Sequence, residues 1–477
     1  MNTPNHSFKS KSAFREHFVY WLLAIITCLG CSAAAAPNKT SIQYRLTLTN
    51  DLANATIDLC RSSSVDLTLS SSHEEAIEYI ATVSKGLALS KQSLTWPAMA
   101  DNCQTISVDL SRYRTNNRYS YRHKGDSSWL RIPSGLLVFR PGSKDETAQL
   151  TMTIDKEYEG SYLLPWRQTS KDTYLVDRLS FMSVPLYFGD FNITKLSKTY
   201  PVNVGFLGRF NQSQMDKITR WLAFSYRHTA RSLNLKNSDF AIVVTRSSSD
   251  SSEAVPYAMV ARGEGTLLRF IVNPTVNYSD LIEDWTSYHE FSHLGLPFID
   301  RREAWVSEGF ASLWQYRVMT NAGVLPPING LRRFWGGIRR GIINHKSSDQ
   351  MSLDRVTSSM SQYRAHRRVY WTGALLWFKL EQAFNQQGKS LTQTIVHFNN
   401  CCRSKYHIWS AKQLAKELDE LLDSDKIQAE FTAAKSTKAF PDYQEIFNGI
   451  DVSVRPNQTL SIGNEKTFLD YFNTSDN

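Results

Sequence analysis

Apolar and polar side chains alternate along the first third of the chain. Residues 42–48 (IQYRLTL), 107–110 (SVDL) and 149–154 (QLTMTI) all follow a period of two. This period is typical of strands with one buried face. The pattern from about residue 42 to residue 196 therefore predicts an antiparallel β-sandwich.

The periodicity changes near residue 200. Residues 212–233 place apolar positions at helical spacing, residues 240–244 (FAIVV) form a short apolar run typical of a buried strand, and amphipathic helical patterns dominate from residue 280 onward. These patterns predict an α+β multidomain protein. We expect a β-sandwich domain over residues 37–200, a second domain over residues 201–330 and a helical C-terminal part over residues 331–477.

The N-terminal segment has the order of a secretory signal. Basic side chains between residues 9 and 15 precede an apolar run over residues 18–31, and small residues follow over 32–36. We expect residues 1–36 to be removed and the protein to be exported to the periplasm or secreted. One alternative is a lipoprotein signal, because Leu-Gly-Cys ending at Cys31 resembles a lipobox; a lipid on Cys31 would then anchor the chain to an outer membrane. The second alternative is that the segment stays uncleaved and anchors the chain in a membrane.

Composition narrows the class of protein. A content of 42% hydrophobic and 12% aromatic residues excludes a disordered chain or a coiled coil. The net charge of +9 falls to +7 when residues 1–36 are removed. This small surplus is spread over the whole chain and forms no basic stripe, so we expect no nucleic-acid partner.

Cysteine use agrees with export. Four cysteines remain after removal of residues 1–36. Cys60 and Cys103 both lie in the strand-rich part, and we expect a structural disulfide between them. Cys401 and Cys402 are adjacent. Because neighbouring cysteines rarely bond each other without a distorted peptide, we assign this pair no role.

The chemistry-bearing motif is H-E-F-S-H at residues 289–293. Asp280, with Glu283 three residues later, predicts the start of the helix that carries it, and a glycine and a proline just past the motif predict its end. Positions i and i+4 share one face of a helix, so both histidines can bind one Zn²⁺. Glu290 then lies beside the metal, where a general base for an attacking water is needed.

A catalytic zinc ion normally has three protein ligands and an open position. Glu308 follows the motif in W-V-S-E-G-F-A-S, at the start of a second helical stretch that runs to about residue 319. We expect His289, His293 and Glu308 to be the ligands. The alternative for Glu308 is a solvated residue favoured by the helix dipole.

These motifs resemble a known family. H-E-F-S-H at 289–293 and W-V-S-E-G-F-A-S at 305–312 look like the gluzincin metallopeptidases, and within them the aminopeptidase N and glycyl aminopeptidase families. Residues 369–376 (VYWTGALL) are similar to the stretch where those families keep an oxyanion-stabilising tyrosine. The resemblance implies an N-terminal β-domain, a thermolysin-like catalytic domain with bound Zn²⁺, Glu290 as the general base and Tyr370 as a hydrogen-bond donor to the transition state.

The sequence also departs from this family. The connection between His293 and Glu308 is about one helical turn tighter, and Gln315 stands where the family often has an acid. No G-A-M-E-N-like strand, which in the family holds the free amine of the substrate, precedes the motif. Glu264, in a segment over residues 256–265, is a candidate for an amine-binding acid. The plainer alternative there is a glycine-rich turn.

The sequence therefore predicts an exported zinc metallopeptidase that acts on a peptide or protein substrate. Aminopeptidase and endopeptidase activity both remain open. A binding or scaffold protein that keeps the gluzincin fold with little turnover is one alternative, and a zinc hydrolase of a non-peptide ester or amide is another. For Tyr370 the alternative to the oxyanion role is that of one more core aromatic on its helix.

Overall fold

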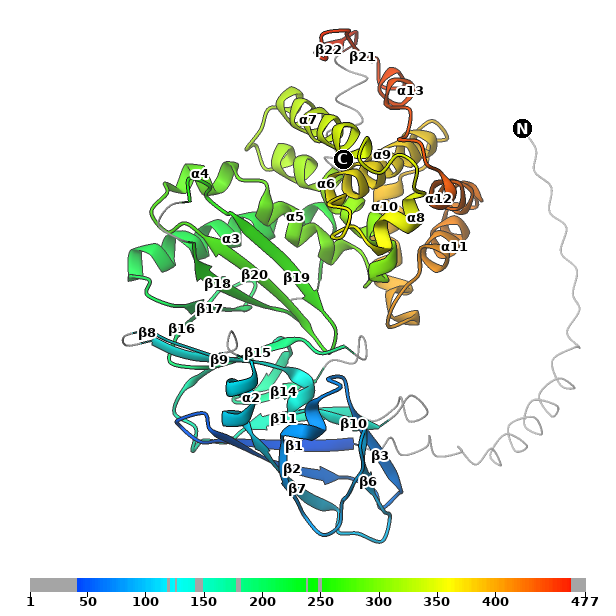
Figure 1. The fold of residues 1–477 in the computed structure, drawn as a ribbon. Helices are drawn as coiled ribbons and strands as arrows, with labels where there is room; N and C mark the ends of the chain where they lie inside the picture. The colour runs from blue at the N-terminus through cyan, green and yellow to red at the C-terminus, as the bar shows by residue number, and fades with distance from the viewer. Residues whose placement is uncertain are drawn as a thin grey trace, which may run out of the picture. The chain divides into compact units, whose positions relative to one another are not determined.

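The structure, a computed structural model, describes residues 41–117, 121–124, 127–141, 149–176, 182–236, 239–247 and 251–464. The expected leader, including Cys31, lies outside the described residues. Within them the protein is of mixed α+β class, as predicted: sheets dominate up to residue 272, and helices with one small hairpin make up residues 278–464 (Figure 1). Among the described residues no helix combines the length and the apolar character needed to span a bilayer.

Two sheets of the N-terminal part share one hydrophobic core. The alternation over residues 42–48 forms β1 (Ser41–Leu48), which buries Ile42, Tyr44 and Leu46. The large sheet, in the order β13-β14-β11-β1-β2-β7-β4, and a second sheet, in the order β10-β3-β6-β5, both contribute to this core. Their other strands are β2 (Asn54–Arg61), β3 (Leu67–Ser71), β4 (Ile80–Val83), β5 (Ala88–Leu89), β6 (Ser93–Trp96), β7 (Cys103–Asp109), β10 (Phe139–Pro141), β11 (Gln149–Ile154), β13 (Arg167–Ser170) and β14 (Thr173–Leu175).

The prediction of purely antiparallel strands is wrong at one pair of the large sheet. β1 runs parallel to β11, with Ile42 opposite Leu150, whereas β1 and β2 are antiparallel. Alternation along a segment reports which face is buried. It contains no information on the direction of a partner strand that lies far along the chain, so this pairing could not be predicted from the pattern.

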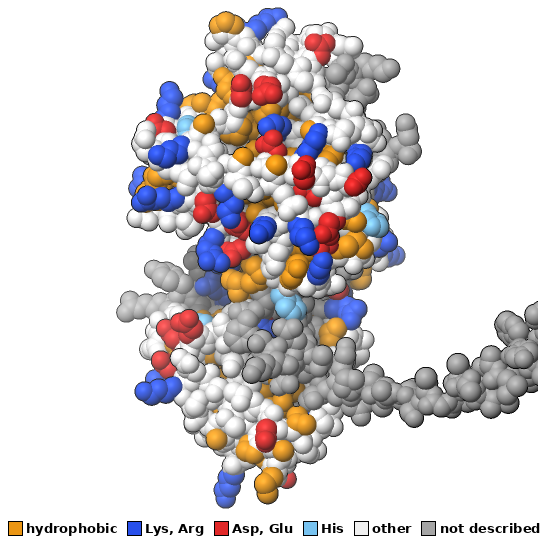
Figure 2. Space-filling model, turned by 90° about the vertical axis from the view of Figure 1, so that its right-hand side faces the viewer, with side chains coloured by type: hydrophobic (Ala, Val, Ile, Leu, Met, Phe, Trp, Pro, Cys, Tyr) orange, Lys and Arg blue, Asp and Glu red, His pale blue; other side chains and the backbone are white. Residues whose placement is uncertain are grey.

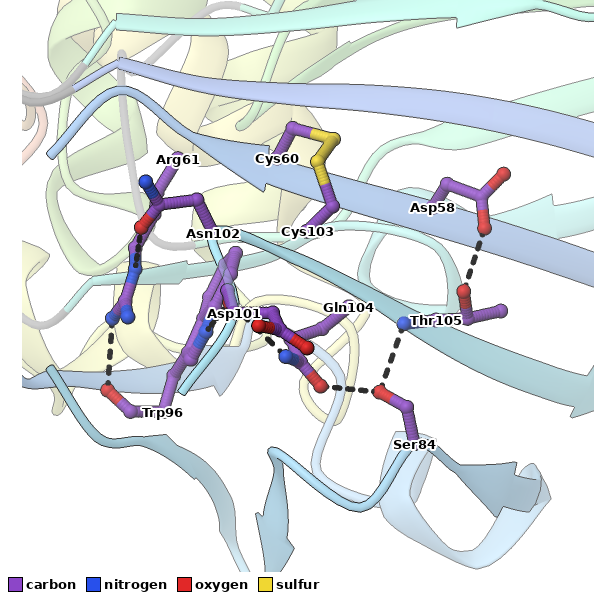
Figure 3. Close-up of a disulfide and its surroundings, with 10 residues drawn as sticks. All are labelled: Asp58, Cys60, Arg61, Ser84, Trp96, Asp101, Asn102, Cys103, Gln104 and Thr105. Atoms are coloured by element: carbon purple, nitrogen blue, oxygen red, sulfur yellow. Dashed lines mark hydrogen bonds between the residues drawn. A yellow bond between two sulfur atoms is a disulfide. The ribbon is translucent and has the colours of Figure 1, made fainter. Parts of the chain in front are cut away.

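The expected disulfide between Cys60 and Cys103 is confirmed. The two residues stand opposite each other on neighbouring strands β2 and β7, and their sulfur atoms are bonded (Figure 3). Close by, the Thr105 hydroxyl donates a hydrogen bond of 2.8 Å to Asp58. The bridge therefore stabilises the N-terminal part and lies within its sheet.

A third sheet has the order β12-β15-β9-β8, and along the chain its strands alternate with strands of the first two sheets. Its strands, with the short helix that precedes them, are α2 (Leu110–Asn116), β8 (Tyr121–Lys124), β9 (Ser127–Pro133), β12 (Ser161–Leu163) and β15 (Pro185–Gly189). The predicted domain boundaries near residues 200 and 330 stay predictions.

A long helix packs against one face of the central sheet. Its strands, in the order β16-β17-β18-β20-β19, are β16 (Asn192–Lys195), β17 (Asn203–Leu207), β18 (Ala241–Arg246), β20 (Thr266–Val272) and β19 (Tyr257–Arg262). The predicted helix is α3 (Gln212–Ser232), which begins with a reciprocal cap between Asn211 and Gln214. Trp221 of α3 packs edge-on against Phe270 of β20, with ring centroids 5.7 Å apart. One face of the sheet is thus buried against α3.

The start of the motif helix differs from its prediction. Asp280 is not an N-cap; its carboxylate accepts a hydrogen bond of 2.9 Å from the Asn277 N–H, and α4 (Tyr278–Glu283) begins three residues earlier than expected. Asp284 then adopts an extended conformation and ends α4. The motif lies on a separate helix, α5 (Thr286–Ser292), followed by a 3₁₀ turn, η4 (His293–Gly295).

Helices form the C-terminal part around a large hydrophobic core. They are α6 (Ala304–Asn321), α7 (Pro327–His345), α8 (Leu353–Ser358), α9 (His366–Asn385), α10 (Leu391–Cys401), α11 (Ala411–Leu422), α12 (Lys426–Ser436) and α13 (Tyr443–Asn448), with the hairpin β21 (Val452–Val454) and β22 (Leu460–Ile462).

Two glycines let α6 and α9 approach each other closely. Gly309 directly follows Glu308, and Gly373 lies three residues after Tyr370. A Cβ atom on Gly373 would overlap the carbonyl oxygen of Trp305 and lie only 2.9 Å from the Cα atom of Gly309. The absence of side chains at this crossing thus brings Glu308 and Tyr370 toward one site.

We expect Gly373→Ala to push α6 and α9 apart. Overpacking of this kind typically lowers the free energy of unfolding by about 1–3 kcal/mol, and urea unfolding measures it. Gly336→Ala on α7 is the matched control, because its Cβ atom would meet only the flexible Arg340 side chain at 3.6 Å. The control should be neutral or stabilising, since alanine favours a helix by about 1 kcal/mol over glycine. Equal effects of both substitutions would contradict the close crossing.

Candidate active site

The structure brings together the three predicted metal ligands. The Nε2 atom of His289 lies 3.2 Å from Glu308 Oε2, and the Nε2 atom of His293 lies 3.5 Å from the same oxygen. One donor atom from each residue lies within 4.8 Å of the others. The two histidines, four residues apart at the end of α5, share a face as predicted, and α6 supplies the glutamate.

The donor atoms fit a zinc ion. In tetrahedral coordination, two donor atoms at about 2.0–2.1 Å from one Zn²⁺ lie about 3.3 Å from each other. This separation is close to the distances between Glu308 and the two histidines. Two imidazoles and one carboxylate are also the donor set of a catalytic zinc site. In the part of the chain that the structure describes, this group contains three ligand residues and no more, which leaves a position for water.

Gln315 orients the first ligand. Its Oε1 atom lies 2.8 Å from Nδ1 of His289, and both side chains are buried. A carbonyl oxygen accepts, so the proton sits on Nδ1 and the lone pair of Nε2 points toward Glu308. Gln315 stands where the family often has an acid, and it still accepts the hydrogen bond that a ligating histidine usually donates.

We expect Gln315→Ala to weaken zinc binding about 10- to 100-fold, the effect typical of losing such a supporting contact. Gln315→Glu keeps an acceptor in the same place and should bind zinc nearly as tightly as the unchanged protein. Competition with a chromogenic chelator measures both affinities. Unchanged zinc affinity in Gln315→Ala would show that this hydrogen bond does not position the ligand.

Glu290 lies at the metal group but is not part of it. Its side chain is almost fully buried, and burial raises its pKa to about 7, with the neighbouring His289 acting in the opposite direction. For Glu308 burial also acts to raise the pKa, but His293 and His289 hold it well below its ordinary value. The two carboxylates therefore differ: Glu308 is ionised as a ligand must be, and Glu290 is placed to exchange a proton near neutral pH.

Tyr370 also reaches the site. Its ring, on α9, is half-buried and lies parallel to the imidazole of His289, with centroids 6.0 Å apart. Burial and the charges of Glu308 and Glu290 raise the pKa of the phenol. The hydroxyl therefore keeps its proton and is available as a donor. The ring also touches the helical core, so its position is compatible with both of the roles considered for it.

Sequence reasoning missed the side chains that hold the turn after the motif. The guanidinium of Arg262 donates to the carbonyl oxygens of His293 and, at 3.0 Å, of Leu296. Arg403 donates to the Leu294 carbonyl at 2.7 Å, and the amide of Asn399 donates to that of Gly295 at 2.9 Å. Carbonyls at a helix end need such donors, and these contacts support the tight connection between the two ligand helices.

Cys401 and Cys402, to which the sequence analysis assigned no role, are bonded to each other although neighbouring cysteines rarely are. Cys402 leaves helical geometry at the end of α10, with φ −128° and ψ −13°, and the two sulfur atoms meet there. This disulfide lies between Asn399 and Arg403, both of which contact the turn after His293. A pattern of apolar positions cannot reveal this local bend.

Glu264 is not brought to the site. It lies in the turn between β19 and β20, fully buried, where it pairs with Arg140 at 3.1 Å and accepts a hydrogen bond from the Ser134 hydroxyl at 2.5 Å. These partners come from the N-terminal part of the chain. The glycine-rich turn, with Gly263 and Gly265 on either side, is therefore the reading that the geometry supports, and Glu264 joins the sheets instead of binding an amine.

A cavity of about 840 Å³ surrounds the metal group. The edge strand β19 forms one wall, and Trp285 and Tyr257 are exposed in it. Besides the glutamates at the metal group, the cavity has two acidic side chains, Glu253 and Asp284, among the described residues. A volume of this size holds a short peptide segment or a small organic molecule.

Comparisons with known proteins find a similar fold among the solved structures. The sequence matches no family model and no curated protein. The fold is similar to that of an aminopeptidase N family protein from Idiomarina loihiensis, with a TM-score of 0.60 and 12% identity over 89% of this chain and 82% of that chain. The chain therefore has the fold of an aminopeptidase N family protein, and the resemblance seen in the motifs is confirmed at the level of the fold.

Two further solved structures are less similar. They are yeast LTA4 hydrolase in complex with Bestatin, with a TM-score of 0.48 and 11% identity over 82% of this chain and 66% of that chain, and Legionella pneumophila aminopeptidase A in complex with aspartic acid, with a TM-score of 0.48 and 14% identity over 84% and 50%.

Proposed function

We propose that this protein is an exported zinc-dependent peptidase. The observation that carries the proposal is the convergence of His289, His293 and Glu308 with Glu290 and Tyr370 in one cavity. The shared fold with an aminopeptidase N family protein supports it. Zinc-dependent cleavage of a peptide library by the purified protein tests it.

The side chains of the site have distinct tasks in this mechanism. His289, His293 and Glu308 would hold a zinc ion, which would supply a Lewis acid for the substrate carbonyl and lower the pKa of a nearby water. Glu290 accepts a proton from the attacking water and delivers it to the leaving amine. The Tyr370 hydroxyl donates a hydrogen bond to the oxyanion that develops on the carbonyl oxygen.

The acids of the cavity bear on the choice between aminopeptidase and endopeptidase. Strand β19 carries no carboxylate between Tyr257 and Arg262, although it forms a wall of the cavity. Of the two acids outside the metal group, Glu253 is exposed, and Asp284 accepts a hydrogen bond of 2.8 Å from the Thr286 N–H and has its pKa raised by burial. We infer that the site does not depend on a free amine at the substrate's N-terminus.

We expect peptides with acetylated and free N-termini to be cleaved with kcat/KM values within about tenfold of each other. A charge-assisted contact to the ammonium group would contribute about 1.5–3 kcal/mol, equivalent to a preference of roughly 10- to 150-fold. Matched peptide pairs measure the ratio. A hundredfold preference for the free amine would overturn the inference, and its loss in Asp284→Asn or in Glu253→Gln would identify the acid that binds the amine.

Export is the second element of the proposal. The two disulfides support it, because such bonds persist in oxidising compartments. The leader pattern over residues 1–36 agrees with it. Mass spectrometry of the mature protein distinguishes cleavage near residue 36 from a lipid on Cys31, and an intact leader on a cytoplasmic protein would contradict export.

A further inference from the structure

A second cavity, of about 550 Å³, lies over α3 and shares no lining residue with the cavity around the metal group. Arg220, Arg227 and Arg231 of α3 line it, together with the hydroxyls of Ser197 and Thr199 and the ring of Tyr278. No Asp or Glu side chain is among the described residues that line it. The cavity is therefore open to the surface and uniformly basic.

The three arginines occupy one face of α3. Their spacing of seven and four residues corresponds to about two turns and one turn of helix, which aligns them. All three side chains are exposed. Within the described part of the chain the guanidinium groups of Arg220 and Arg227 lie over aromatic rings, and none of the three arginines forms an ion pair or a side-chain hydrogen bond. Their N–H donors are thus available to a ligand.

One of these groups is held in place before any ligand arrives. The guanidinium of Arg220 lies 3.7 Å from the centroid of the Tyr278 ring. Stacking on an aromatic face leaves the planar edge of the guanidinium, with its N–H donors, pointing outward. Tyr278 therefore reduces the conformational freedom that Arg220 would lose on binding an anion.

Arg220, Arg227 and Arg231 form an arginine cluster, and no acidic side chain among the described residues that line the cavity neutralises its charge. The pKa of His228, on the next turn of α3, is lowered by burial and by the charges of Arg227 and Arg231. On the face drawn in Figure 2, basic and acidic side chains are interspersed. The helical part of the chain contains ion pairs such as Lys435–Glu303. The basic cavity is thus unlike the ordinary mixed surface.

We propose that this cavity binds a small ligand with at least two phosphate or sulfate groups. Arginine matches such tetrahedral oxyanions through paired N–H donors. Arg220 and Arg231 are eleven residues apart on α3, which places their Cα atoms about 16 Å apart. One anionic group is too small to engage both ends of the cluster, whereas a ligand with two or more groups spans it. The hydroxyls and the tyrosine ring suit the neutral part of such a ligand.

Isothermal titration of the full mature protein tests the proposal. The probes are fructose 1,6-bisphosphate, sucrose octasulfate, inorganic phosphate and an oligo-aspartate peptide, all at about 0.15 M ionic strength, where screening removes weak long-range attraction. We expect the bisphosphate or the octasulfate to bind at least about tenfold more tightly than inorganic phosphate or the peptide, because several charge-assisted hydrogen bonds form together. Tighter binding of the oligo-aspartate peptide would overturn the ligand class.

Two triple variants distinguish a site from general electrostatic attraction. Arg220→Ala/Arg227→Ala/Arg231→Ala removes the cluster, and the control replaces three exposed arginines elsewhere with alanine, namely Arg167, Arg339 and Arg355. The first variant should lose at least about tenfold in affinity and the control less than about threefold. Equal losses, or no binding by the unchanged protein, would overturn the proposal. Zinc content should be unaffected in both variants, which separates this test from that of the peptidase site.

Discussion

Glu290→Gln should retain zinc and lose at least about 10²-fold in kcat, the scale typical of a general base. The substitution preserves the size and the hydrogen-bonding reach of the side chain and removes only its ability to accept a proton. Glu290 lies beside the ligands and is not one of them, so metal binding should be unchanged. Metal analysis and peptide hydrolysis on the same preparation measure both quantities.

Glu283→Gln is the matched control for this substitution. Glu283 ends the preceding helix α4, is exposed and does not line the cavity. Its amide variant should keep both zinc and turnover. Undiminished turnover in Glu290→Gln would remove the general base from the mechanism, and loss of zinc in this variant would show that the carboxylate is a ligand.

Tyr370→Phe should lower kcat by roughly 10²–10³-fold, equivalent to about 2.7–4 kcal/mol of transition-state stabilisation. The hydroxyl is protonated, because burial and the neighbouring carboxylates raise its pKa. Zinc content and thermal stability should remain nearly unchanged, since the ring is kept. KM should change little, because the hydrogen bond forms to a charge that exists only in the transition state.

Tyr288→Phe provides the comparison. The Tyr288 ring is buried on α5, and its hydroxyl donates to the Ile282 carbonyl at 3.1 Å. Loss of that hydrogen bond should lower stability by about 1 kcal/mol and leave kcat unchanged. If Tyr370→Phe instead behaves like Tyr288→Phe, with full turnover and a lower melting temperature, Tyr370 is a core aromatic and not an oxyanion donor.

Local sequence patterns predicted the elements that depend on local chemistry. The alternation over residues 42–48 identified β1, and the i, i+4 spacing of the motif placed His289 and His293 on one face. These two inferences depend on a periodicity that the backbone itself imposes. Glu308 could be selected from its position after the two histidines and from the resemblance of residues 305–312 to the gluzincin families.

Features that depend on distant partners could not be predicted in this way. The parallel pairing of β1 with β11 and the burial of Glu264 against Arg140 join segments far apart in the sequence. Arg262 and Arg403 hold the turn after His293 from two separate elements. Nothing in the neighbourhood of these arginines in the sequence distinguishes them from solvated side chains, because their role exists only once the fold has formed.

The cap of α4, the helix that precedes the motif helix, shows a third kind of limit. The sequence offers two such caps. Asp280 is followed by Glu283 three positions later, and Asn277 is followed by Asp280 three positions later. The backbone uses the earlier pair and then breaks at Asp284. Two registers of one signal compete here, and the sequence pattern by itself does not distinguish them.

Zinc content and hydrolysis, measured on one preparation of the mature protein, test whether this protein is a zinc peptidase. We expect one zinc ion per chain, loss of that zinc in His293→Ala and Glu308→Ala, and cleavage of a mixed peptide library that stops on chelation and returns with added zinc. Full zinc occupancy without any peptide cleavage would contradict the peptidase and favour a binding or scaffold protein. Undiminished zinc in either ligand variant would contradict the metal site itself.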